Sequence, residues 1–70
     1  MSEVWERGES RGWTAANFAV AYENATKSSE PPDYATAADE AGYSHPADLL
    51  NFGAGFSAGW YRYMREDYPD

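Results

Sequence analysis

Three glycines interrupt a helix-like stripe of large side chains near the C-terminal end of the chain, and they constrain how that helix can pack. At roughly 100° per residue, the large side chains of this stripe fall within one third of a helix circumference: Leu49, Phe52, Phe56, Trp60, Tyr63 and Met64. Each glycine costs a helix roughly 0.5–1 kcal/mol relative to alanine. We therefore expect Gly53, Gly55 and Gly59 to permit the close approach of another backbone.

The composition requires a core of aromatic rings packed on alanine and glycine. The 70 residues include no isoleucine, two leucines and two valines, against twelve alanines, three tryptophans, six tyrosines and three phenylalanines. Each buried ring removes about 150–250 Å² from water, so a few rings suffice for a small domain. The residues expected in this core are Phe18, Tyr22, Leu49, Phe52, Phe56, Trp60 and Met64. The stability margin of a domain this small is narrow, and assembly into a homodimer would widen it.

The pattern predicts a single all-α domain with three helical segments and a loop. The first helix is expected over about residues 14–26, with Thr14 as its cap and Phe18 and Tyr22 on its inner face. Residues 3–11 either extend this helix or form a short separate one, because Gly8 and Gly12 leave the boundary open. Residues 27–33 contain Pro31 and Pro32 and are expected to be a loop.

The second half of the chain predicts a short helix, a turn and a long helix. Asp33 or Thr36 can cap a helix over about residues 34–41, and Gly42 supplies a left-handed stop. The last helix is expected over about residues 46–67. Its cap is Ser44 or His45, and Pro46 stands in its first turn.

The chain is strongly acidic. Twelve Asp and Glu residues oppose one Lys and four Arg, which gives a formal net charge of −7. Such a surface repels the phosphates of nucleic acids and of anionic lipids. The carboxylates are scattered along the chain, and this favours a role in solubility. Docking on basic proteins and adaptation to high salt remain the alternatives.

The sequence offers little to catalysis or to metal binding. The chain has no cysteine, so disulfides and thiolate sites are excluded. The single histidine, His45, precedes a proline at a helix start, where solvation or capping is its expected role. No spacing typical of a catalytic triad, a phosphate loop, a zinc site or a calcium site occurs. We therefore expect no enzymatic activity, no metal and no cofactor.

The sequence also lacks the signals of export and of membrane insertion. Acidic residues stand near the N-terminus where a signal peptide has basic ones, and no window approaches ~18 consecutive apolar residues. A cytoplasmic protein without membrane contact is the expectation.

Residues 37–49 resemble the helix-turn-helix of AraC-type regulators. The match to the pattern A-x-x-x-G-[FY]-S-x-P rests on Ala38, Gly42, Tyr43, Ser44, Pro46 and Leu49. This resemblance implies DNA binding by the helix that begins at Pro46. That helix has no Lys or Arg before Arg62, whereas phosphate contacts by these residues dominate DNA affinity. We therefore retain the turn as a structural expectation and do not expect nucleic acid as the partner.

The segment Gly55-Phe56-Ser57-Ala58-Gly59-Trp60 is similar to the G-F-x-A-G-[WY] helix of small acidic proteins from actinobacteria and their phages. This resemblance implies an accessory protein that interacts with the host, and it supplies no catalytic residues.

The aromatic residues outside the two main helical stripes permit two interpretations. They either complete the core or form an exposed patch, since Trp, Tyr and Arg are enriched at interface hot spots. The best cluster for partner binding is Tyr61, Arg62, Arg65 and Tyr68. The sequence thus predicts a protein-binding accessory module, such as a phage-encoded inhibitor or modulator of a host protein. An acidic DNA mimic and a degenerate helix-turn-helix domain are the alternatives.

Overall fold

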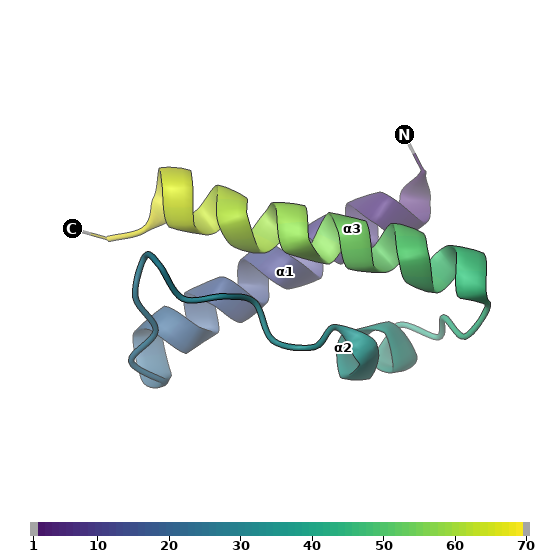
Figure 1. Ribbon diagram of the computed structural model, residues 1–70, viewed down its shortest axis with the longest axis horizontal. Helices are drawn as coiled ribbons and strands as arrows, with labels where there is room; N and C mark the ends of the chain where they lie inside the picture. Colours follow the sequence, from purple (N-terminus) through teal and green to yellow (C-terminus); the bar gives the residue numbers. More distant parts are fainter. Residues whose placement is uncertain (1, 70) are drawn as a thin grey trace.

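The structure is a computed structural model that describes residues 2–69, and in this range it is entirely helical and loop. It contains α1 (Glu3–Tyr22), α2 (Ala35–Glu40) and α3 (Pro46–Arg62), and α3 continues directly into the π-helix η1 (Tyr63–Asp67). The prediction of an all-α domain with three helices is confirmed. Figure 1 shows α3 crossing α1, with the connecting segment and α2 on one side of the pair.

The first helix includes the residues before Thr14, for which the sequence left two alternatives open. It begins at Glu3, because the Ser2 Oγ accepts a hydrogen bond of 3.0 Å from the Trp5 N–H and caps the helix. Of the two alternatives for residues 3–11, extension of the first helix is the one that the structure shows, so Thr14 lies inside α1 and is not its cap. The predicted end at residue 26 was wrong. The helix ends at Tyr22, and Asn24 follows in the left-handed conformation with φ 61°.

Helices α1 and α3 run in the same direction and cross through glycines on both helices. A Cβ atom added at any of these glycines would overlap a backbone carbonyl oxygen of the other helix, so the two backbones are in direct contact. The facing pairs are Gly8 with Phe52, Gly12 with Phe56, Gly55 with Trp5 and Gly59 with Glu9. Close approach of another backbone was predicted for Gly53, Gly55 and Gly59. It occurs at Gly55 and Gly59, whereas Gly53 faces the ring of Tyr34. Gly8 and Gly12 lie inside α1 and mark no helix boundary.

The buried side chains form two clusters, one toward each end of the crossing. The first joins α1 to the C-terminal part of α3 and to η1, and it consists of Ala16, Ala19, Trp60, Tyr63 and Met64. The second joins α2 to the N-terminal part of α3 and consists of Ala38, Phe52 and Phe56, with Leu49 half-buried against them. Alanines and aromatic rings supply nearly all of both clusters, as the composition requires.

Phe18 and Tyr22 lie outside this core. Their exposed fractions are 54% and 75%, so the prediction that the two rings are buried was wrong. The rings contact each other with their centroids 4.9 Å apart. The reason for the error is that α1 turns its glycine and alanine face, which includes Ala16 and Ala19, toward α3.

The short helix, the turn and the start of α3 follow local capping rules. The Asp33 Oδ1 accepts a hydrogen bond of 2.8 Å from the Ala35 N–H, whereas Thr36 lies within α2. Gly42 follows the helix with φ 89°, a conformation that glycine adopts without strain. The His45 Nδ1 then accepts from the Ala47 N–H at 3.1 Å and caps α3. His45, one of the two predicted caps, therefore has a structural role.

Candidate protein-binding groove

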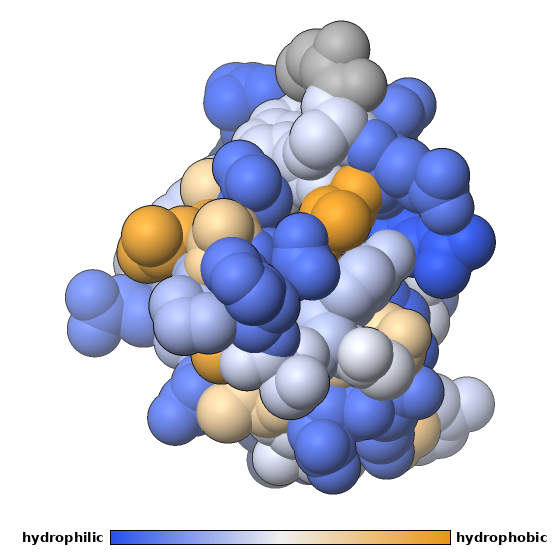
Figure 2. Space-filling view, turned by 90° about the vertical axis from the view of Figure 1, so that its right-hand side faces the viewer, coloured by the Kyte–Doolittle hydropathy of each residue, from blue (hydrophilic) through white to orange (hydrophobic). Residues whose placement is uncertain are grey.

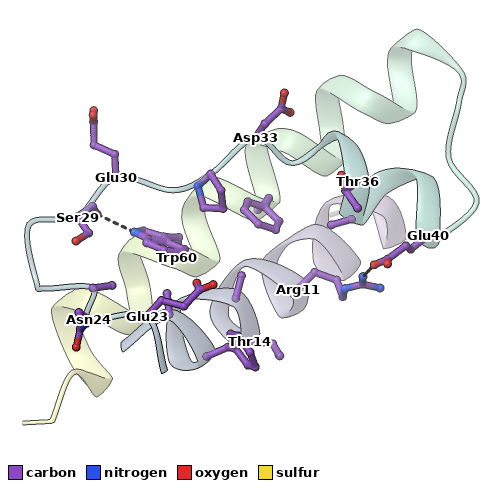
Figure 3. A pocket seen from close by; sticks show the side chains of 17 residues that line it. Arg11, Thr14, Glu23, Asn24, Ser29, Glu30, Asp33, Thr36, Glu40 and Trp60 are labelled. Carbon is purple, nitrogen blue, oxygen red and sulfur yellow. Dashed lines mark hydrogen bonds and ion pairs between the residues drawn. The ribbon is translucent and has the colours of Figure 1, made fainter. Parts of the chain in front are cut away.

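An open groove lies between the C-terminal half of α1 and the segment that returns from α1 to α3. We define the groove by the residues that line it. They come from α1 and its end (Arg11, Thr14, Ala15, Phe18, Ala19, Glu23), from parts of residues 24–33 and of α2, and from Phe56 and Trp60 of α3. Figure 3 shows these side chains from close by. The volume of the groove is about 1020 Å³, which is the upper end of the range for ligand sites.

The floor of the groove is apolar and fixed. Phe56 and Trp60 are each 3% exposed and reach the groove from α3, while Ala19 is buried on α1. Above this floor, Phe18 stands at the α1 border as a half-exposed ring. A partner that enters the groove would therefore contact an apolar surface whose supporting side chains belong to the core.

Two polar contacts hold the far border of the groove in place. The Trp60 indole Nε1–H donates a hydrogen bond of 2.9 Å to the carbonyl oxygen of Ser29, which fastens the returning chain to α3 (Figure 3). At the other end, an ion pair of 2.5 Å between Arg11 and Glu40 joins α1 to α2. Both contacts are single and partly or fully exposed, so this border is held less firmly than the floor.

The groove is bordered by carboxylates. Glu23 stands on the α1 side, and Glu30 and Asp33 stand on the loop side (Figure 3). None of the ion pairs between described residues involves these three groups. Arg11 is the only cation among the described lining residues, and Glu40 neutralises it. The floor of the groove is therefore apolar, and its rim is negative, with the Glu23 side chain reaching toward the recess and those of Glu30 and Asp33 directed outward (Figure 3).

The structure separates the residues that the sequence grouped as a partner-binding cluster. Arg62 is directed at α1, where it pairs with Glu9 at 3.2 Å, and Tyr68 packs half-buried against the first core cluster. Tyr61 is 47% exposed, and Arg65 is exposed and pairs with Glu66 at 2.6 Å. Only Tyr61 and Arg65 therefore remain on the outer face of α3 and its extension, and their role in binding stays a prediction.

A second, smaller recess of about 370 Å³ is lined by residues of α2, of the segments on either side of it and of α3, among them Asp39, Tyr43 and Leu49. On the face that Figure 2 presents, hydrophobic side chains form small islands among hydrophilic ones. Among residues 2–69, no three His, Asp or Glu side chains are placed to hold a metal ion together. Within the same range, no helix has the length and apolar character needed to cross a membrane.

Comparisons with protein-family models, with curated proteins and with solved structures give no match for this chain. Function is therefore inferred from the groove and its surroundings.

The sequence contained the groove's residues but no signal of their grouping. Glu23 and Glu30 belong to the scattered carboxylates, and Phe18 was assigned to the core. The usable signal was the repeated spacing of Gly8 with Gly12 and Gly55 with Gly59. Two small-residue faces of equal spacing predict a close crossing, and that crossing would have turned Phe18 away from α3.

Proposed function

We propose that this protein is a non-enzymatic protein-binding module that holds a helical segment of a partner protein in the groove. The observation that carries the proposal is an open apolar recess with the exposed ring of Phe18 at its border. Exposed aromatic rings beside a recess are typical of binding surfaces, because burial of a ring on association contributes strongly to affinity. An accessory role, as inhibitor or modulator of a host protein, is the form of binding that the resemblance to actinobacterial and phage proteins implies.

A helix suits the groove better than an extended peptide does. The described residues contain no strand, so the groove has no sheet edge to which an extended peptide could add its backbone. An extended segment in an apolar recess would leave its N–H and C=O groups without partners. A helix satisfies these groups internally and presents apolar side chains at positions i, i+3, i+4 and i+7.

The frame around the groove supports this use. The floor belongs to the α1–α3 crossing, where backbones touch and little movement is possible. The opposite border is a loop and a short helix that are fastened at Ser29 and Glu40. A rigid floor lowers the entropy cost of binding, because its side chains are already ordered. An adjustable border admits partner side chains of different shapes.

A display library of random peptides tests the proposal. Peptides of about 16 residues, long enough to form a helix, are selected against the wild-type protein and then measured against two variants. Thr14→Trp fills the groove from an exposed position in its lining. Ala54→Trp places the same ring at an exposed position of α3 that does not line the groove.

We expect the selected peptides to lose at least about tenfold in affinity on Thr14→Trp, equivalent to about 1.4 kcal/mol, and to retain affinity on Ala54→Trp. Circular-dichroism melts of both variants show whether they are folded. Failure to enrich any peptide, or equal tolerance of the two variants by all peptides, would contradict the proposal.

A further inference from the structure

The charges around the groove define the chemistry of the segment that it accepts. We infer that this segment is a basic amphipathic helix, which carries Lys or Arg on both flanks of an apolar face. The inference rests on the proposed function and adds to it the charge of the partner. Glu23, Glu30 and Asp33 receive the cations, and Phe18 with the floor of the groove receives the apolar face.

These three carboxylates are available because the arginines of the chain are engaged elsewhere. Each arginine pairs with a different carboxylate: Arg7 with Glu3, Arg11 with Glu40, Arg62 with Glu9 and Arg65 with Glu66. The single lysine, Lys27, does not line the groove. The negative charge of the groove is therefore not compensated by ion pairs within the described part of the molecule. A partner with cations at the groove's edges would supply the compensation, and charge complementarity of this kind also raises the association rate.

The end of α1 adds to the negative potential. The helix C-terminus carries a partial negative charge from its unpaired carbonyl groups, and α1 has no basic residue in its last turn to offset it. Glu23 is the C-cap residue of this same helix and lines the groove. A cation on the partner that approaches Glu23 would therefore interact with a full charge and with the helix dipole together.

Carboxylates on both borders set the spacing that the partner has to match. Glu23 lies on the α1 border and reaches toward the groove, while Glu30 and Asp33 lie across it on the returning segment, with their side chains directed outward at the rim (Figure 3). Long Lys or Arg side chains of a partner reach such rim positions from the flanks of a helix. An apolar stripe with cations on each flank fits between them. The ring pair of Phe18 and Tyr22, exposed at the α1 border, offers a face to a guanidinium group as well. A partner with acidic flanks would be repelled on both sides.

Three synthetic peptides of about 18 residues test the inference. All carry Leu at positions i, i+3, i+4 and i+7. The remaining positions are Lys in the first peptide, Gln in the second and Glu in the third. Binding to the wild-type full chain is measured by fluorescence anisotropy at about 0.05 M and about 0.5 M salt. We expect the Leu/Lys peptide to bind at least about tenfold more tightly than the Leu/Gln peptide. The affinity of the Leu/Lys peptide should fall severalfold at the higher salt. The Leu/Glu peptide should not bind.

Two variants that lose the same number of charges locate the effect. Glu23→Gln, Glu30→Gln and Asp33→Asn together neutralise the groove, and the amide oxygen that the last substitution introduces can still accept from the Ala35 N–H. Glu6→Gln, Asp39→Asn and Asp48→Asn together remove three charges from residues that do not line the groove. We expect the first triple variant to weaken the Leu/Lys peptide about tenfold and the second to weaken it less than about twofold.

Equal weakening by the two triple variants would overturn the inference, because binding would then follow the overall charge of the protein. Binding of the Leu/Gln or Leu/Glu peptide as tight as that of the Leu/Lys peptide would overturn it as well. In that case the proposed function is tested separately by measuring peptide binding to Thr14→Trp. The proposed function is supported if this variant abolishes the binding. Absence of binding by all three peptides overturns the inference, and the display selection then decides on the proposed function alone.

Discussion

The α1–α3 crossing and the segment that returns between these helices are built in opposite ways. In the crossing, four glycines bring backbone against backbone, and no side chain separates Gly59 from Glu9 or Gly12 from Phe56. In residues 23–45, one short helix is anchored by the buried Ala38, and the rest of the segment is held by partly buried side chains and by single polar contacts, such as the hydrogen bond from Trp60 to Ser29. Regions with few buried contacts open more easily than the core. The groove lies where the two regions meet, and it combines a fixed floor with a border that can adjust.

The backbone contact in the crossing explains why a chain with almost no branched aliphatic residues can form a defined core. Direct contact of backbones replaces the interdigitation of large side chains along the middle of the crossing. The rings are then free to fill the two ends, as Phe52 and Trp60 do. The returning segment receives little of this packing, and its two prolines limit the freedom of the loop instead.

The largest expected effect is that of Gly59→Ala. A Cβ at this position overlaps the Glu9 carbonyl and approaches the Trp13 nitrogen at 2.9 Å, and neither group can rotate away. We expect the free energy of unfolding to fall by about 3 kcal/mol, a large part of the roughly 4–10 kcal/mol of a domain this size. Chemical denaturation measures this loss.

Gly53→Ala is the matched control on the same helix, with the same gain in helix propensity. Its Cβ meets the ring of Tyr34, which is half-buried and can shift. We expect a change within about 1 kcal/mol in either direction. Similar losses for the two substitutions would show that backbone contact does not distinguish the crossing from the rest of the molecule.

The sequence was sufficient to predict the fold class and the buried residues of α3. The stripe from Phe52 to Met64 follows helical periodicity, and the glycines beside it indicate close packing. It was not sufficient for α1. Ser2 as a cap and the glycines at positions 8 and 12 look like ordinary features of a loop or a boundary until the partner helix is known. Burial of Phe18 was predicted from its own helix alone, but burial depends on which face another element covers.

The groove could not be predicted for a related reason. Its carboxylates are up to ten residues apart in the sequence, and what brings Glu23 and Asp33 to opposite borders is the path of the returning chain. That path depends on the left-handed Asn24 and on the tertiary hydrogen bond at Ser29. Neither has a periodic signal in the sequence. Conversely, the ion pair between Arg62 and Glu9 has no signal in the sequence, because it depends on the crossing of α1 and α3.

A smaller effect is expected from Trp60→Phe, which probes the border of the groove. The substitution removes the only indole N–H that reaches Ser29 and leaves most of the ring in the core. We expect a loss of about 1–2 kcal/mol from the hydrogen bond and the reduced volume. Hydrogen exchange should accelerate at the Thr26 and Ser29 amides, which are bonded within this loop. Amides at Gly12 and Gly59 should change much less, and a uniform acceleration would contradict the separation into two regions.

The smallest effect on stability is expected from Tyr61→Ala combined with Arg65→Ala, which tests whether the outer face of α3 binds the partner. Tyr61 is half-exposed and Arg65 pairs only with its neighbour Glu66, so the free energy of unfolding should change by less than about 0.5 kcal/mol. Both residues lie outside the groove lining. Peptides that depend on the groove should therefore bind this double variant as they bind the wild-type protein, as measured by fluorescence anisotropy. Loss of their binding with an unchanged melt would move the binding surface to α3, because an aromatic and a guanidinium anchor can each contribute more than about 2 kcal/mol.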